Sequence, residues 1–259
     1  MSIRVGLVSD THGFHARDIV EYFIAATGVD TLLIAGDLED YRGYSRPTIF
    51  IRGNNESLPV LHELLLGTRT PAGLRYLPDG ERLVLAGHGI AAIGGKWGRD
   101  GKRGGRWIDP DALASLAKDP RPDIVISHDS PLSAAEHDVD DPRLAAACAA
   151  VAPRLWVSGH RHRYAEGRIG STPVIGLGIW PHDWVTVELE PGRIGQPVRF
   201  VPDDPSYGER VEAWRELKRE ESQLLRELQG RPGRRRLVYG VTEPPNEHAQ
   251  HWFGRSPSG

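Results

Sequence analysis

The feature that most constrains the fold is a series of short apolar runs, many of which end in polar or glycine-rich turns. They cover residues 3–10, 31–37, 48–54, 82–89, 123–129, 154–160, 172–178 and 183–190. Each run is too short for an independent helix, and several lack strict alternation, as strands covered on both faces do. Helical patterns lie between them, at about 16–26, 57–66, 110–118 and 142–151. Strands alternating with helices predict an α/β layered fold, and the strand-rich second half predicts two facing sheets.

Length, charge and cysteine content narrow the class of protein. A chain of 259 residues can bury one sizeable core, and its net charge of −3 argues against a general nucleic-acid or membrane binder. Cys148 is the single cysteine, which excludes internal disulfides and fits a reducing compartment. No apolar stretch reaches the ~18 residues of a membrane helix, and a strand-like run begins at Ile3, without a signal peptide before it. We therefore expect a cytoplasmic protein that does not enter a membrane.

The distribution of apolar and charged residues along the sequence changes after about residue 200. Residues 208–229 place apolar side chains at near-helical spacing among many charges, which predicts one amphipathic helix. We divide the chain into a domain at 1–200 and an extension at 201–259, made of this helix and a flexible polar tail. Two interpretations of the helix stay open. It packs on the domain's own surface, or residues 209–229 form a homodimer or bind a partner protein.

Seven polar side chains follow the ends of predicted strands: Asp10, His12, Asp37, Asn54, His128, His160 and His162. Taken singly, each has an ordinary explanation as a cap, a turn residue or a hydrogen-bonded histidine. Together they suggest a site, because loops at the carboxyl ends of strands converge in layered α/β folds. Carboxylate, imidazole and amide oxygens suit divalent metals, with Mn²⁺ our first choice and Fe, Zn²⁺, Ni²⁺ or Co²⁺ as alternatives. Seven ligands are too many for one catalytic ion but suit two ions ~3.5–4 Å apart.

Five short polar segments follow one another along the sequence: DTH at 10–12, GDLED at 36–40, GNNE at 53–56, SH at 127–128 and GHRH at 159–162. Over about residues 1–190 the sequence thereby resembles the calcineurin-like metallophosphoesterases. The resemblance implies a four-layer α/β/β/α sandwich that carries two metals. It also implies that Asp10, His12, Asp37 and His162 hold one metal, and that Asp37, Asn54, His128 and His160 hold the other. The implied activity is hydrolysis of phosphoric esters, with a metal-bridging hydroxide as in-line nucleophile.

Asn55 departs from the commonest pattern of that family. A histidine usually stands there and is thought to donate a proton to the leaving oxygen, oriented by an aspartate at the position of Asp40. We assign Asn55 and Asp40 to the catalytic set, although an amide cannot usefully transfer a proton at pH 7. This predicts activity on phosphodiesters or activated esters rather than on alkyl phosphomonoesters. In the alternative, His15 or His88 supplies the proton.

The segment 94–107 interleaves lysine and arginine with Trp97 and Trp107. Such a loop can pair with phosphates and stack on bases, so Arg103 and Trp97 are candidate substrate-binding residues; a solvated glycine-rich loop explains the pattern equally well. The leading hypothesis is a phosphodiesterase acting on nucleotides or nucleic-acid ends. The alternatives are a non-catalytic scaffold that binds a partner through the C-terminal helix, and a phosphomonoesterase or protein phosphatase.

Overall fold

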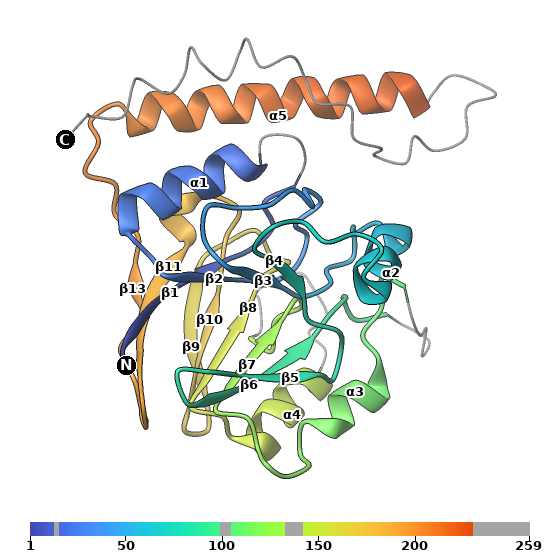
Figure 1. Ribbon diagram of the computed structural model, residues 1–259, viewed down its shortest axis with the longest axis vertical. Helices are drawn as coiled ribbons and strands as arrows, with labels where there is room; N and C mark the ends of the chain where they lie inside the picture. Colours follow the sequence, from blue (N-terminus) through green and yellow to red (C-terminus); the bar gives the residue numbers. More distant parts are fainter. Residues whose placement is uncertain (13–15, 99–104, 133–141, 230–259) are drawn as a thin grey trace. The chain divides into compact units, whose positions relative to one another are not determined.

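The computed structural model describes residues 1–12, 16–98, 105–132 and 142–229 (Figure 1). By their contacts, the residues fall into two compact units, Met1–Arg219 and Glu220–Gly259. Of the second unit, the structure describes residues 220–229, the last part of helix α5 (Tyr207–Gln229). Our division of the chain at residue 200 stays a prediction.

Two mixed sheets form the centre of the first unit. Sheet A runs in the order β12-β11-β1-β2-β3-β4, with β13 also paired to β11, and sheet B in the order β5-β6-β7-β8-β10-β9. The strands of sheet A are β1 (Ile3–Val8), β2 (Thr31–Ile34), β3 (Thr48–Phe50), β4 (Leu74–Tyr76), β11 (Val185–Glu190), β12 (Arg193–Ile194) and β13 (Val198–Arg199). Those of sheet B are β5 (Arg82–Leu85), β6 (His88–Ile93), β7 (Ile124–Ser127), β8 (Leu155–Ser158), β9 (Ala165–Ile169) and β10 (Thr172–Gly176).

Helices cover the outer faces of both sheets (Figure 1). They are α1 (Ala16–Thr27), α2 (Leu58–Leu66), α3 (Pro110–Ser115) and α4 (Pro142–Val151), and a short 3₁₀ turn, η2, spans Pro181–Asp183. Alternation along the strands explains the layers. In β2, Leu32 and Ile34 pack with α1, whereas Leu33 points into the cluster between the sheets. In β7, Ile126 enters the same central cluster, whereas Val125 packs with α3 and α4. The predicted α/β/β/α sandwich is confirmed.

One predicted strand is a hairpin. We assigned residues 82–89 to a single strand, but β5 ends at Leu85 and β6 begins at His88, paired antiparallel. Ala86 and Gly87 form the turn, with φ of 50° and 84°. Two successive residues at positive φ match the right-handed twist of a tight hairpin, and Ala86 lacks the usual Asn or Asp signal of such turns.

The start of α5 packs against the first unit's own surface. Val211 and Trp214 are buried in the cluster that includes α1, and the Trp214 ring lies 5.6 Å from that of Tyr22 in an edge-to-face arrangement. Tyr22 also stacks on Tyr207, at 5.9 Å. This agrees with the first interpretation of the helix, and a dimer or partner interface through 209–229 finds no support.

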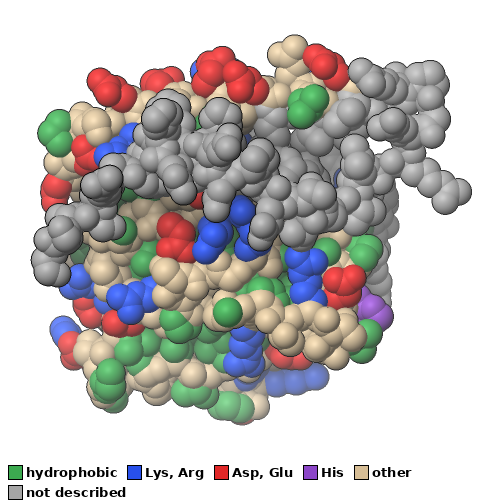
Figure 2. Space-filling model, turned by 45° about the horizontal axis from the view of Figure 1, so that its top comes forward, with side chains coloured by type: hydrophobic (Ala, Val, Ile, Leu, Met, Phe, Trp, Pro, Cys, Tyr) green, Lys and Arg blue, Asp and Glu red, His purple; other side chains and the backbone are tan. Residues whose placement is uncertain are grey.

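Charged side chains of both signs are interspersed on the described surface seen in Figure 2. This agrees with the near balance between 32 lysine and arginine residues and 35 acidic ones. Within the described part of the chain, no helix combines the length and apolar character needed to cross a membrane.

Candidate metal centre

The parallel strands bring their carboxyl ends together. Strands β1 to β4 run parallel to one another, as do β6, β7, β8 and β10. The loops that follow them are joined by backbone hydrogen bonds, from Asp10 N to Gly36 O and from His12 N to Asp37 O, both 3.1 Å. In sheet B, Gly159 N donates to His128 O at 3.0 Å. The polar residues predicted at strand ends therefore share one edge of the sandwich.

The backbone at this edge is strained. Within the described ranges, eight residues other than glycine have positive φ, and six of them lie here: Asp10, His12, Asp37, Glu39, His160 and His162. Such conformations cost about 1–3 kcal/mol each and persist where the surrounding structure enforces them. Their clustering is what a functional site would produce.

Asp10, His12, Asp37 and His162 form one part of the site. His162 Nε2 lies 3.2 Å from both Asp10 Oδ1 and His12 Nε2. His12 Nε2 lies 3.6 Å from Asp37 Oδ2. Asp10, His12 and His162 can each offer a ligand atom within 4.8 Å of the others, and so can Asp10, Asp37 and His128. Ligand atoms at these distances from one another can bind the same cation.

His128 and Asn54 extend the site toward sheet B. The Nδ1 of His128 lies 2.8 Å from the carbonyl oxygen of Ala35, which can only accept, so Nδ1 carries the proton. Its Nε2 then faces Asn54 Oδ1 at 3.1 Å and Asp37 Oδ2 at 3.5 Å. This ring nitrogen and the two oxygens are a ligand set for a cation.

His160 lies near this group of ligands through its ring and its backbone. Its ring centroid lies 5.0 Å from that of His128, and its backbone N–H donates to Asp10 Oδ2 at 2.8 Å. Burial, followed by the neighbouring His128, lowers the pKa of His160 to about 4. The ring is therefore neutral at pH 7, which is the form that binds metals.

The chemistry of Asp10 tests whether these residues fit a cation. Burial raises the pKa of this carboxyl, but His162, His128 and His12 together outweigh burial and lower it to about 2. The carboxylate is thus ionised and fully buried, and its Oδ1 lies 3.2 Å from His162 Nε2 without a hydrogen bond of good geometry. An ionised oxygen in that state is costly unless a positive charge compensates it. The residues fit divalent cations.

Asn55 holds Asp37. Its backbone N–H donates to Asp37 Oδ1 at 2.8 Å, and its side-chain Nδ2 donates to Asp37 Oδ2 at 2.7 Å. The carboxylate of Asp40 binds a different residue, because Arg42 Nε donates to both of its oxygens, at 2.8 and 3.2 Å. No hydrogen bond joins Asp40 to Asn55 among the described contacts. The catalytic assignment of this pair stays a prediction.

The predicted substrate-binding residues are only partly described. Arg103 lies outside the described residues. Trp97 is half-buried against the outer cluster of sheet B, and the Arg143 guanidinium lies 3.3 Å from its ring centroid. Its backbone N–H donates to Asp129 Oδ2 at 2.9 Å, next to His128. These contacts give Trp97 a packing role, and base stacking by it stays a prediction.

Two glutamates near the site were not assigned roles from the sequence. Glu56 is buried and accepts from Leu38 N at 2.9 Å and Gly53 N at 2.6 Å, which ties two ligand-bearing loops together. Burial, and then Asp37, raises its pKa well above the usual range. Glu39 lies 2.6 Å from His12 Nδ1. Burial lowers the pKa of His12, but Glu39 and the nearby aspartates outweigh it and raise the pKa overall.

The sequence matches a family model described as calcineurin-like phosphoesterase over residues 3–164, well over half of the chain. The chain belongs to this family. The matched residues include every predicted metal ligand, and the calcineurin-like phosphoesterases are metal-dependent hydrolases. No curated protein sequence matches the chain.

Solved structures match this chain at low sequence identity. The calcineurin-like phosphoesterase described above is similar to the protein TT1561 of Thermus thermophilus, with a TM-score of 0.55 and 15% identity, over 77% of this chain and 99% of that one. An archaeal phosphodiesterase matches 76% of this chain and 100% of its own length, with a TM-score of 0.43 and 13% identity. At 15% identity, the likeness to TT1561 concerns the fold alone.

Gly159 leads to a first testable prediction for this calcineurin-like phosphoesterase. A Cβ atom at this position would overlap Ser9 Oγ and lie 2.6 Å from Asp10 Oδ2. We expect Gly159→Ala to lower the free energy of unfolding by about 1–3 kcal/mol, measured by urea denaturation, because the loops after β1 and β8 must separate. Gly208→Ala is the control, since nothing lies within 4 Å of its Cβ. Equal unfolding midpoints for the two variants would contradict this close approach.

Proposed function

We propose that the protein is a dinuclear metal-dependent phosphodiesterase that acts on nucleotide or nucleic-acid-type phosphoesters. Family membership supports the coarser statement, hydrolysis of phosphoesters with divalent metal ions. The preference for diesters rests on one observation: Asn55 stands where a proton donor is expected, and its amide is committed to Asp37.

The proposed ligands are those implied by the sequence. One ion would be held by Asp10, His12, Asp37 and His162, and the other by Asp37, Asn54, His128 and His160. When bound, the ions, with Mn²⁺ as first choice, would supply Lewis acidity for the phosphoryl group and for the attacking water. Asp37 would serve both ions, because each of its oxygens has two lone pairs and uses only one of them to accept a hydrogen bond from Asn55. Asn55 would thereby fix the orientation of the shared carboxylate.

Solvent access differs across the ligands and indicates where a substrate arrives. The side chains of Asp10 and His128 are 0% exposed, that of His12 is 18% exposed, and that of His162 is 47% exposed. The site is therefore closed toward His128 and open toward His162. A phosphoester would approach from the His162 side.

The leaving group would depart without strong help from a protein acid. The amide of Asn55 can donate a hydrogen bond but not a proton at neutral pH. His88, an alternative donor, lies at the start of β6, at the opposite end of the parallel strands from His128. It is buried, with Nε2 2.7 Å from Glu190 O. His15, the other alternative, lies outside the described residues.

The nucleotide part of the proposal rests on the 94–107 segment. Lys96 and Trp107 are joined by a β-bridge, and Lys96 Nζ lies 5.8 Å from the Trp107 ring centroid. Asp129, the neighbour of His128 in sequence, binds the backbone N–H of Trp97. This contact places the backbone of Trp97 close to the proposed ligands, and the cations and aromatic rings in the sequence of 94–107 are the residue types that phosphate pairing and base stacking require.

Substrate comparison tests the proposal. With Mn²⁺ added to chelator-treated protein, kcat/KM for bis-p-nitrophenyl phosphate should exceed that for serine phosphate, because missing general-acid help typically costs ~10²–10⁴-fold with a poor leaving group. Cyclic nucleotides, dinucleotides and nucleic-acid ends complete the panel, with Ni²⁺ and Zn²⁺ as alternative metals. Protein without added metal is the control. Faster hydrolysis of serine phosphate would refute the diesterase preference.

A further inference from the structure

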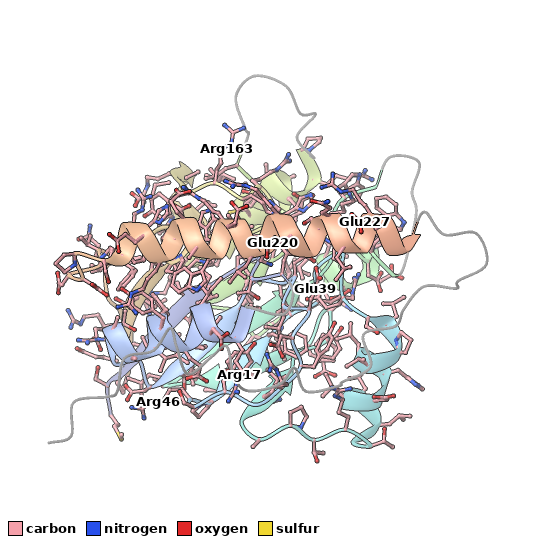
Figure 3. All side chains as sticks on the ribbon, turned by 90° about the horizontal axis from the view of Figure 1, so that it is seen from above. Arg17, Glu39, Arg46, Arg163, Glu220 and Glu227 are labelled. Atoms are coloured by element: carbon pink, nitrogen blue, oxygen red, sulfur yellow. The ribbon has the colours of Figure 1, made fainter. Side chains whose placement is uncertain are left out.

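Glu39 lies in the loop that follows β2 and is labelled in Figure 3. None of the roles assigned above to the GDLED segment uses it. Its Oε1 lies 2.6 Å from His12 Nδ1, and both side chains are 18% exposed. The contact is therefore short and largely shielded from water. It joins residues that are 27 positions apart in the sequence.

The two nitrogens of the His12 ring face different groups. Nδ1 faces Glu39, whereas Nε2 faces His162 Nε2 at 3.2 Å and Asp37 Oδ2 at 3.6 Å. An ionised carboxylate can only accept, so a neutral His12 ring keeps its proton on Nδ1. The lone pair of Nε2 is then directed into the ligand cluster. Glu39 thus selects the tautomer that can bind a metal.

The backbone holds Glu39 in this position. His12 N donates to Asp37 O at 3.1 Å, and Thr11 Oγ1 donates to Leu38 O at 3.1 Å, so the two loops run side by side. Glu39 and His12 both have positive φ, at 55° and 39°. An ordinary backbone conformation at Glu39 would redirect its side chain, and the fold keeps the strained one.

We propose that Glu39 is a positioning residue that fixes the tautomer and ring orientation of His12 and thereby tightens the binding of the ion that His12 holds. The inference rests on the two-ion site proposed above. Atoms of His12, Asp37 and Glu39 also lie within 4.8 Å of one another, but Oε1 is on the Nδ1 side of the ring, away from Nε2. Glu39 therefore acts through His12. Carboxylates that support a metal-binding histidine in this way typically contribute ~10–100-fold to metal affinity.

Metal titration of the full chain tests this inference. We expect isothermal titration with Mn²⁺ to show two ions bound by the natural sequence, and Glu39→Ala to weaken one of them by ~10–100-fold while the other is unchanged. Glu39→Gln should lose less, because its amide oxygen still accepts from Nδ1–H. Glu63→Gln is the matched control, since Glu63 is half-exposed and pairs only loosely with Arg69, at 3.7 Å.

A second measurement separates positioning from general support of the fold. In the Zn²⁺-loaded protein, long-range ¹H–¹⁵N spectra should show His12 protonated at Nδ1, and Glu39→Ala should lose this single tautomer. Unchanged affinity for both ions, or equal weakening of both with a lower melting temperature of the metal-free protein, would overturn the inference. Failure of the natural sequence to bind two ions would instead overturn the proposed function, and the inference with it.

Discussion

Replacing Asp37 with alanine is expected to abolish metal-dependent hydrolysis. Its carboxylate lies within 3.6 Å of His12 Nε2 and 3.5 Å of His128 Nε2, so it contacts both proposed ligand sets. We expect kcat/KM for bis-p-nitrophenyl phosphate to fall by more than the ~10–100-fold typical of a residue that only supports a ligand. Elemental analysis should show fewer than two ions per chain. Both losses follow from removing one shared group.

Asp203→Ala is the control for this substitution, because Asp203 is exposed and lies outside the site. The control should keep its metal content and its activity. Asp37→Ala protein that is folded, retains two ions and hydrolyses the diester at the normal rate would contradict the proposed role of Asp37. A circular dichroism melt of each variant separates loss of metal from loss of fold.

The second large effect is expected from combining Asn55→His with Arg42→Ala. A histidine at position 55 brings a group that can donate a proton, but Asp40, its expected orienting partner, is bound by Arg42. Removing Arg42 leaves Asp40 able to accept from the new ring. We expect the double variant to gain up to ~10²–10⁴-fold in kcat/KM for serine phosphate, and Asn55→His alone to gain much less.

The four proteins of this cycle test the coupling directly. Arg42→Ala alone is the matched control, since it changes the charge near the site without adding a proton donor. The gain of the double variant should exceed the product of the two single effects, because the substitutions act through one pair of side chains. Metal content must be measured in each, since Asn55 also holds Asp37. If the two single effects simply multiply in the double variant, Arg42 does not keep Asp40 from orienting a histidine at position 55.

The layers of the fold were predictable because local patterns encode them. Val125 and Ile126 point to opposite faces of sheet B, and both faces are covered, so their strand reads as continuously apolar. Strand β9 escaped prediction for the opposite reason. Its segment at Ala165–Ile169 is mostly exposed and has no apolar run, and it is held by pairing with β10. Such an edge strand depends on its neighbour.

The positions of the candidate ligands were predictable, but their partners were not. Asp37 and His128 stand out because each follows a buried strand. The contacts of Asn55 with Asp37 and of Glu39 with His12 span 18 and 27 positions, and no periodicity links such residues. The contact of Trp97 with Arg143 on α4 is a further partner that the sequence pattern did not indicate, and base stacking by Trp97 stays a prediction.

The candidate ligands come from both halves of the sandwich. Asp10, Asp37 and Asn54 follow strands of sheet A, whereas His128, His160 and His162 follow strands of sheet B. Cations bound here would therefore act as cross-links between two layers that meet through apolar packing and through hydrogen bonds such as the one from His160 N to Asp10 Oδ2. The lone cysteine rules out an internal disulfide. The bound cations would then be a reversible cross-link between the two sheets, formed or lost according to the metal concentration in solution.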